Sequence, residues 1–182
     1  VNDNMIKEGY GKLYLPNGNI YEGFFMDNCM EGRGRLISIE GYIIEGDFVN
    51  DNVSGYGKWM DMNGTVYKGN WLLNKKNGMG EEIYLDGSHY FGKFEQGKKN
   101  GKGKFTFKEG NSYEGEFCNN EMKGEGKYKF KDGRMYLGQF NNNKMNGYGL
   151  FYWPDKKIYY GHYTNNMKDG FGLFKWPDGK KY

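Results

Sequence analysis

The chain repeats itself every 23 residues, and glycines recur at fixed places in the repeat. With a tyrosine or isoleucine taken as position 1, seven units begin in turn at Tyr21, Ile44, Tyr67, Tyr90, Tyr113, Tyr136 and Tyr159. Glycine then occupies positions 3, 12 and 14 of every unit. A period of this length is typical of arrays whose small units stack, so that they bury together what none of them buries alone.

Both ends of the chain fall inside a unit. Residues 1–20 match the later part of a repeat, residues 21–181 hold the seven units, and Tyr182 begins a further one. We therefore expect the chain to be part of a longer array.

Each unit is predicted to be a β-hairpin. In residues 113–117 and 124–130 apolar and polar residues alternate with period two, which is typical of strands, and Asp132-Gly133 is a turn dipeptide. The lysine-rich positions 8 to 11 between the strands are predicted to form the hairpin tip. No segment shows the 3.6-residue apolar period of a helix. The sequence thus predicts an all-β fold, an elongated single-layer antiparallel array of β-hairpins.

The glycines predict how such a layer could have a core. A ring can lie flat on a neighbouring strand only where that strand carries no side chain, so glycines at positions 3, 12 and 14 should form troughs for rings. Position 5 supplies an aromatic residue in every unit, and positions 16 and 18 supply more. Each covered ring would bury about 150–250 Å². The units should therefore fold cooperatively.

Composition excludes several classes of protein. No run of about 18 apolar residues occurs, which argues against a membrane-spanning helix. Two cysteines far apart in sequence suit reduced thiols, and a net charge of +3 indicates no particular partner. Gly101-Lys102-Gly103 lacks the helix that a phosphate-binding glycine loop needs after it. We expect no enzymatic activity, no cofactor and no nucleic-acid partner.

The pattern Tyr-x-Gly-x-aromatic, then Gly-x-Gly, then Asp/Asn-Gly resembles the MORN repeat (membrane occupation and recognition nexus) over essentially the whole chain. The resemblance implies an elongated single-layer sheet of hairpins. Members of the family include junctional membrane proteins, lipid kinases, a lysine methyltransferase and cytoskeletal scaffolds of protists. A chain that consists only of repeats is most similar to the last group, and its Asn- and Lys-rich composition fits a basal-complex scaffold that dimerises through its C-terminal repeats.

Two residues depart from the pattern in the first half of the chain. Ile44 replaces the tyrosine of position 1, and Glu82 replaces the apolar residue of position 16. We expect the first to weaken packing around its unit.

Lysines of the predicted hairpin tips have two interpretations. They could protect exposed strand edges from stray pairing, as lysine does in many sheets. They could instead attract anionic lipid headgroups. Interleaved acidic residues favour edge protection. The candidate lipid-binding residues are Lys75, Lys76, Lys98, Lys99 and Lys102.

Aromatic residues crowd into the last two units and predict a contact surface. Tyr152 and Tyr160 fall on the polar side of the alternation, so they are not obvious core residues. Two chains could meet here about a twofold axis, or a following repeat could cover this end. The candidate homodimer interface comprises Tyr152, Trp153, Tyr159, Tyr160, Tyr163, Phe171, Phe174 and Trp176.

Soft metal ligands are few. Cys118 and His162 have no partner at the spacing of an intrachain zinc site, so a metal could join them only between two chains. The sequence as a whole predicts a non-enzymatic, self-associating scaffold of a cytoplasmic, membrane-associated cytoskeletal structure. The alternative is a phospholipid-binding or targeting module of a larger protein.

Overall fold

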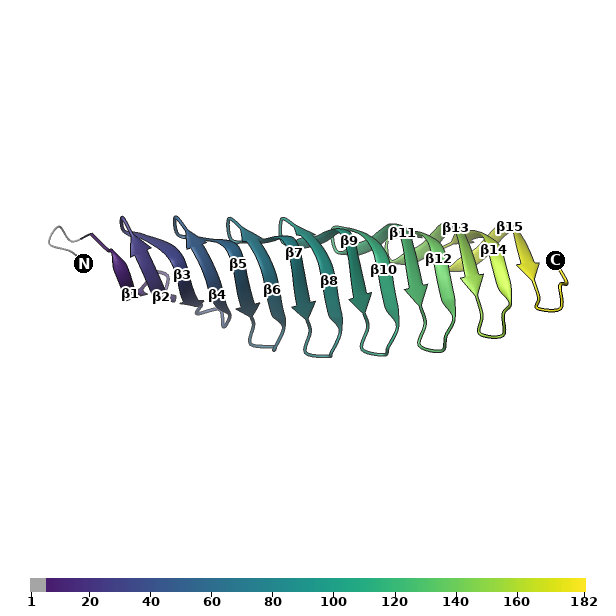
Figure 1. Ribbon diagram of the computed structural model, residues 1–182, viewed down its shortest axis with the longest axis horizontal. Coiled ribbons are helices and arrows are strands. Elements are labelled where there is room, and N and C mark those ends of the chain that lie inside the picture. Colours follow the sequence, from purple (N-terminus) through teal and green to yellow (C-terminus); the bar gives the residue numbers. More distant parts are fainter. Residues whose placement is uncertain (1–5) are drawn as a thin grey trace. The chain divides into compact units, whose positions relative to one another are not determined.

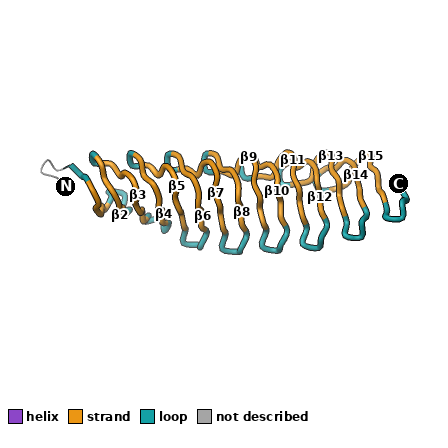
Figure 2. Tube along the Cα trace, in the orientation of Figure 1, coloured by secondary structure: helices purple, strands orange, loops and turns teal. Residues whose placement is uncertain are grey.

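A computed structural model describes residues 6–182, and no helix occurs among them (Figures 1 and 2). Nothing in that part of the chain could therefore cross a membrane as a helix. The chain divides into two compact units. Unit 1 comprises the residues up to Leu85 together with 94–97, and unit 2 comprises residues 86–93 and 98–182.

Unit 1 contains seven strands, which are β1 (Gly9–Tyr14), β2 (Ile20–Met26), β3 (Cys29–Ile37), β4 (Ile43–Val49), β5 (Asn52–Met60), β6 (Val66–Leu72) and β7 (Lys75–Ile83). Unit 2 contains β9 (Lys98–Thr106), β10 (Ser112–Cys118), β11 (Glu121–Lys129), β12 (Met135–Asn141), β13 (Lys144–Tyr152), β14 (Ile158–Thr164) and β15 (Met167–Lys175). Strand β8 (His89–Glu95) is divided between the two units.

Within each unit every strand pairs antiparallel with its neighbours in the sequence, from β1 to β7 and from β9 to β15. Each unit is accordingly a single layer of hairpins (Figure 1). This confirms the predicted all-β class and the antiparallel hairpin array.

The hairpin tips are shorter than the sequence suggested. Positions 7 and 8 alone make the turn, and both have positive φ, as at Asn142 (49°) and Asn143 (65°). Two consecutive residues of this kind form a type I′ turn, whose twist matches that of the flanking strands. Because β13 begins at Lys144, positions 9 to 11 already belong to a strand. The prediction of a tip at positions 8 to 11 is therefore wrong.

The residue at position 8 links consecutive hairpins at their tips. The side-chain Oδ1 of Asn143 accepts a hydrogen bond from the backbone N–H of Met122 at 2.8 Å, and its own N–H donates to the Met122 carbonyl at 3.2 Å. We call this pair of hydrogen bonds the tip clamp. It recurs between Lys7 and Asn28, Met30 and Asp51, Val53 and Asn74, Lys99 and Asn120, and Met145 and Asn166. Gly97 makes only the backbone bond, to Lys76.

A pair of opposite substitutions tests the clamp. Gly97→Asn should raise the free energy of unfolding by about 1 kcal/mol, since it adds one side-chain hydrogen bond. Its φ is +84°, a conformation that asparagine tolerates, and nothing lies within 4 Å of the added Cβ. Asn143→Gly keeps the turn, removes the same bond and should lower that free energy by about the same amount. Denaturant unfolding measures both. Shifts of the same sign would contradict the role given to the side chain.

The core of each repeat, except the one that begins at Ile44, is a tyrosine lying over two glycines. Tyr113 is fully buried; a Cβ at Gly126 would overlap its ring, and a Cβ at Gly115 would overlap its hydroxyl and the facing backbone. Its hydroxyl donates to the carbonyl of Glu116 at 2.8 Å, which satisfies the one polar atom of the ring. Phe117 packs edge-to-face against it, with ring centroids 5.1 Å apart. The predicted troughs are thus confirmed for positions 3 and 14.

Position 12 has a different role. Gly124 has φ +76° and lies where the register shifts between Gly115 and Phe117, at a β-bulge. A Cβ there would meet the side chain of Glu116, which points away from the rings. The prediction that position 12 makes room for a ring is therefore wrong: the bulge needs glycine for its left-handed backbone conformation.

Ile44, the one residue that replaces the tyrosine, is compensated by its neighbour. The indole of Trp71 covers Gly57, the position-14 glycine of the repeat that begins at Ile44. Its Nε1–H donates to the Gly57 carbonyl at 3.3 Å. A ring with a polar hydrogen thus still covers the glycine. Ile44 itself is buried, and the tryptophan at position 5 of the next repeat covers part of the space that a tyrosine would fill, while Ile44 still lines an open recess.

Candidate functional site

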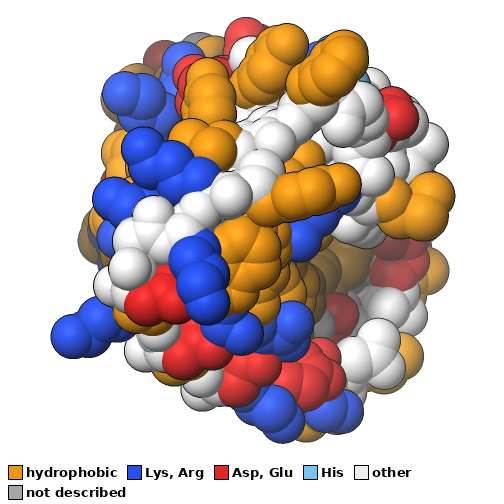
Figure 3. Space-filling model, turned by 90° about the vertical axis from the view of Figure 1, so that its right-hand side faces the viewer, with side chains coloured by type: hydrophobic (Ala, Val, Ile, Leu, Met, Phe, Trp, Pro, Cys, Tyr) orange, Lys and Arg blue, Asp and Glu red, His pale blue; other side chains and the backbone are white. Residues whose placement is uncertain are grey.

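Side chains from both ends of the strands meet above the buried tyrosines. Lys168, at position 10, lies beside the hairpin tip at one end of the strands. Trp153, at position 18, lies at the other end, beside the turn that joins consecutive repeats. The Lys168 Nζ nevertheless lies 4.9 Å from the Trp153 ring centroid and 4.5 Å from that of Tyr159. We call the surface formed by positions 10, 16 and 18 the ring face. At the end of unit 2, Figure 3 shows a hollow with hydrophobic side chains beside it and charged side chains along part of the rim.

A continuous row of rings lines the ring face of unit 2. Neighbouring rings have centroids between 4.4 and 5.8 Å apart. All are half-buried except Phe151, which is buried. We call this row the aromatic ladder, and its members, from positions 16 and 18 of four repeats, are Phe105, Phe107, Tyr128, Phe130, Phe151, Trp153, Phe174 and Trp176.

Position 10 forms the opposite wall of the ring face. In unit 2 it carries Lys99, Met122, Met145 and Lys168, so the two lysines lie at the outer repeats and the two methionines between them. The Lys99 Nζ lies 5.2 Å from the centroid of the Tyr90 ring. Partial desolvation lowers the pKa of Lys168 below its ordinary value. Ammonium groups over ring faces are stabilised by the ring quadrupole.

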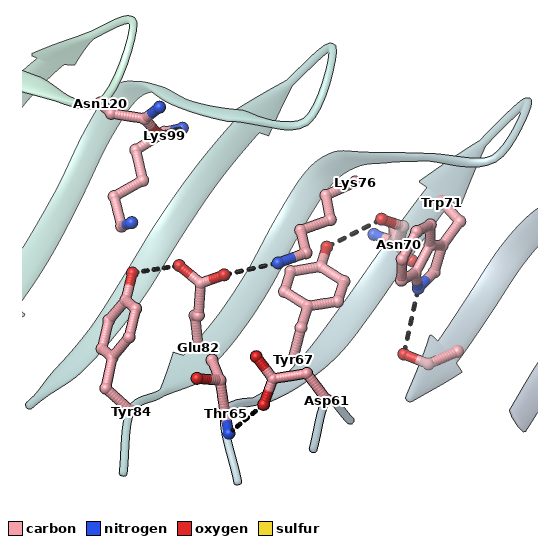
Figure 4. Close-up of polar contacts among 11 residues, drawn as sticks. Asp61, Thr65, Tyr67, Asn70, Trp71, Lys76, Glu82, Tyr84, Lys99 and Asn120 are labelled. Atoms are coloured by element: carbon pink, nitrogen blue, oxygen red, sulfur yellow. Dashed lines mark hydrogen bonds and ion pairs between the residues drawn. The ribbon is translucent and has the colours of Figure 1, made fainter. Parts of the chain in front are cut away.

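The ring face of unit 1 is polar where that of unit 2 is aromatic. Glu82 replaces the ring of position 16 and is buried, with 7% of its surface exposed. Its carboxylate lies 2.5 Å from the Lys76 Nζ and accepts a hydrogen bond from the Tyr84 hydroxyl (Figure 4). The Lys76 ammonium also lies 4.6 Å from the centroid of Trp59.

A recess opens in the ring face of unit 1 beside these residues. Its volume is ≈ 380 Å³, and Leu36, Ile44, Val53 and Trp59 supply apolar walls. Two of these walls, Ile44 at position 1 and Leu36 at position 16, are aliphatic where the repeats of unit 2 carry rings. Apolar contact is thus available on the ring face of both units, in different forms.

Two indole N–H groups of the ladder have no protein acceptor among the described residues. The Trp71 indole donates to Gly57, but neither Trp153 nor Trp176 makes a side-chain hydrogen bond within the part of the chain that the structure describes. Both indoles are half-buried. Neither N–H is among the buried unpaired atoms of the described residues, so both donors are accessible to an external acceptor.

The candidate lipid-binding lysines lie on two faces. In unit 1, Lys76 turns to the ring face, and in unit 2 Lys99 does so, each over rings. Their neighbours in the strands, Lys75 and Lys98, are exposed and point the opposite way. Lys102 is exposed too, and its register partner is an acidic residue, Glu116. Within unit 2, Lys99 therefore lies apart from the other two lysines of the set.

The candidate dimer residues fall into three groups. Trp153, Phe174 and Trp176 belong to the aromatic ladder. Tyr159 and Tyr163 are core residues, 6% and 2% exposed, so they support the surface from beneath. The members that point away from the ring face are Tyr152, half-buried, and the exposed Tyr160 and Phe171.

Cys118 and His162 lie on the face opposite the rings. The His162 ring packs edge-on against Tyr148, and Cys118 lies beside Glu116 and Glu125 in an open recess of ≈ 570 Å³. Within residues 6–182 no group of three metal-ligating side chains is assembled. A metal shared between two chains stays a prediction.

Sequence reasoning missed positions 8 and 10. Asparagine or aspartate occupies position 8 in six of the seven repeats, and this recurrence is a signal for a side-chain hydrogen bond at the turn. Position 10 alternates between methionine, valine and lysine, as at Met122 and Lys168. The sequence predicts a loop at position 10, so it gives no sign that this side chain turns toward the rings.

The buried tyrosines predict a stability loss at alkaline pH. Burial raises the pKa of Tyr21 and of Tyr136 from 10.0 to about 12, and it also raises the pKa of Tyr67 and Tyr113. The unfolded chain therefore releases these protons at lower pH than the folded chain does. Stability should be unaffected below pH 10 and should fall as the pH rises to 12.

Absorbance and circular dichroism recorded together check this. Exposed tyrosines should ionise first without loss of β signal, and the remaining tyrosinate should appear together with unfolding. Complete ionisation of all 17 tyrosines in an intact β structure would show that the rings are not buried as described.

Comparison with known proteins identifies the repeat. A family model described as MORN repeat matches residues 6–20, 21–41, 45–66, 67–89, 90–112, 113–133, 136–157 and 159–181. The chain belongs to the MORN-repeat family. A search of curated proteins gave no match for this MORN-repeat chain.

Two solved structures share the fold of this MORN-repeat chain. The TCP domain of SAS-4 (dCPAP) of Drosophila melanogaster, solved in complex with a proline-rich motif of Ana2 (dSTIL), is 9% identical with a TM-score of 0.52, over 95% of this chain and 87% of that one. The TCP10 domain of Danio rerio CPAP is 13% identical with a TM-score of 0.52, over 100% of this chain and 90% of that one. At this identity the likeness shows the fold alone.

Proposed function

We propose that this MORN-repeat chain is a non-enzymatic scaffold that binds a segment of another protein along the aromatic ladder of unit 2. The observation that carries the proposal is the ladder itself: a continuous row of rings from four repeats, all but Phe151 half-buried, with Lys99 and Lys168 lying over rings at its two ends. Contiguous exposed apolar surface on a soluble protein is typical of an interaction site.

Two further findings support protein binding. Trp153 and Trp176 place indole donors on the same surface as the rings, so polar and apolar contacts are available together. The Drosophila TCP domain, which shares the fold, was solved in complex with a proline-rich motif. A single layer of hairpins with a bound peptide is thus a known arrangement for a related fold.

Selection from a random peptide library tests this function. The full chain is the bait, and selected peptides are measured against Phe130→Gln, a ladder variant, and Leu137→Gln, a change on the opposite face with 48% exposure. We expect peptides that lose at least ~10-fold in affinity with Phe130→Gln and bind Leu137→Gln unchanged. Equal binding to both variants, or no enrichment at all, would contradict the proposal.

Self-association belongs to the same proposal in a finer form. Two joined chains would form a longer scaffold than one chain does. The aromatic residues of the last repeats are the candidate contact surface, and among them Phe171 is 99% exposed. Light scattering of the full chain and of Phe171→Ser should report a dimer and a monomer respectively. A wild-type monomer at tens of micromolar would remove the homodimer from the account. Assignment to a protist basal complex, or to a cytoplasmic cytoskeletal structure beneath a membrane, stays a prediction.

Membrane targeting is the second candidate, and family membership favours it as well, since MORN repeats suggest a membrane- or lipid-associated role. Exposed Lys75 of unit 1 and Lys98 of unit 2 are the residues that could meet headgroups. Flotation with phosphoinositide vesicles should be weakened when both become glutamate. Flotation that survives this change would place any lipid contact elsewhere.

A further inference from the structure

The repeat spacing of unit 2 selects the conformation of a bound segment. Two hydrogen-bonded strands per repeat, about 4.8 Å apart, return the ladder to an equivalent ring pair about every 9.6 Å. A polyproline II helix returns the same face every three residues, about 9.3 Å. Over three repeats the two periods differ by about 1 Å in total.

Other conformations do not keep this register. The heptad of an α-helix advances about 10.5 Å, which accumulates a mismatch of almost 3 Å over three repeats. An extended strand advances about 9.9 Å in three residues, but its third residue then points to the opposite side. Only the polyproline II segment presents one side chain to every ring pair of the ladder.

The polar groups of the ring face suit the same conformation. A polyproline II segment has no internal hydrogen bonds, so all of its carbonyls can accept from outside. Trp153 and Trp176 carry indole N–H groups with no acceptor in the described chain, one repeat apart on the ladder. Aromatic grooves that bind proline-rich segments use the low conformational entropy of this helix.

Charge at the end of the ladder adds a preference. The Lys168 Nζ lies within 4.9 Å of three ladder and core rings, at Trp153, Tyr159 and Phe174. Methionines occupy the same position in the two preceding repeats. A carboxylate on the bound segment would therefore find an ammonium partner at this end.

We propose that the aromatic ladder binds a proline-rich segment in polyproline II conformation, with an apolar residue at every third position and an acidic residue beside Lys168. This rests on the proposed protein-binding function and adds the class of partner to it.

Synthetic peptides test the period directly. The probe is a fluorescein-labelled peptide of three Leu-Pro-Pro units closed by a fourth leucine, with glutamate at both ends. A second peptide spaces its leucines every fourth residue with proline between them, and a third is an alanine-based helix with the same leucines one heptad apart. We expect the full chain to bind the first at least ~10-fold more tightly than the other two by fluorescence anisotropy.

Variants locate the contacts. Trp153→Phe keeps an aromatic ring but removes the indole donor. It should weaken binding of the first peptide roughly 2–10-fold, as expected for the loss of one hydrogen bond. Lys168→Met should also weaken binding of the first peptide, but it should not change the affinity for a version with glutamine in place of glutamate. Leu137→Gln on the opposite face is the control. Thermal melts verify that each variant folds.

The outcomes separate this inference from the function it rests on. Equal affinity for the first two peptides, or preference for the helical one, would overturn the polyproline II assignment. If the synthetic peptides fail while library peptides still bind in a ladder-dependent way, the segment class is wrong and the protein-binding function stands. If neither set depends on the ladder, both fail.

Discussion

Replacing Gly34 by alanine is expected to lower the free energy of unfolding by about 3–5 kcal/mol, because the added methyl displaces a core ring. A Cβ at this position would overlap the ring and hydroxyl of Tyr21, which is 0% exposed. The ring cannot shift, since its hydroxyl is bonded to the Phe24 carbonyl at 3.0 Å. Its edge also packs against Phe48, with ring centroids 5.0 Å apart. Denaturant unfolding of the full chain measures the loss.

Gly11 provides a matched control within the same unit. It occupies position 14 of the first, partial repeat, and a Cβ there would meet only the Phe25 ring, at an ordinary 3.6 Å. Its φ does not require glycine, so Gly11→Ala should be neutral or stabilise by up to about 1 kcal/mol through the unfolded chain. Similar losses from Gly11→Ala and Gly34→Ala would show that glycine serves the strand itself rather than the ring above it.

Removing the lysine of the buried ion pair should have an effect of similar size. Lys76→Met is expected to lower the free energy of unfolding by about 3 kcal/mol, because it removes the ammonium that lies 2.5 Å from the buried carboxylate of Glu82. The side chains of Lys76 and Glu82 are only 16% and 9% exposed. The lost cation–ring contact with Trp59 adds to the effect.

The double variant Lys76→Met/Glu82→Phe should recover most of that loss. It gives unit 1 the residues that the ladder of unit 2 has at the same positions, Met145 and Phe151. Replacement of a buried ion pair by packed apolar groups is often neutral or stabilising. Losses that simply add across the two single changes would mean that Lys76 and Glu82 do not act as a pair.

Much of the fold could be predicted from the sequence because the residues that form the core recur at the same positions of successive repeats. Tyr113, Gly115 and Gly126 recur in equivalent form in almost every unit, so the ring-on-glycine core was visible without coordinates. The β-bulge was not, since Gly124 looks like another glycine of the same strand. A bulge changes which face a residue occupies, and a period of two cannot reveal it.

The candidate site was predicted only in part. The rings of positions 16 and 18 were identified, but as core. Their half exposure depends on whether the position-10 side chain covers them, and Lys168 was assigned to a loop tip. Trp71 covers the glycine of the Ile44 repeat from the next repeat, and the pattern within a single repeat does not predict a contact of this kind.

Fluorine NMR of the full chain labelled with 5-fluorotryptophan tests most directly whether the ladder is the binding surface. The chain has four tryptophans, so single Trp→Phe variants assign all the signals. On addition of a peptide selected from the library, the signals of Trp153 and Trp176 should shift, while that of Trp71, buried and bonded to Gly57, should stay in place. Saturated binding with the signals of Trp153 and Trp176 unmoved would contradict the account.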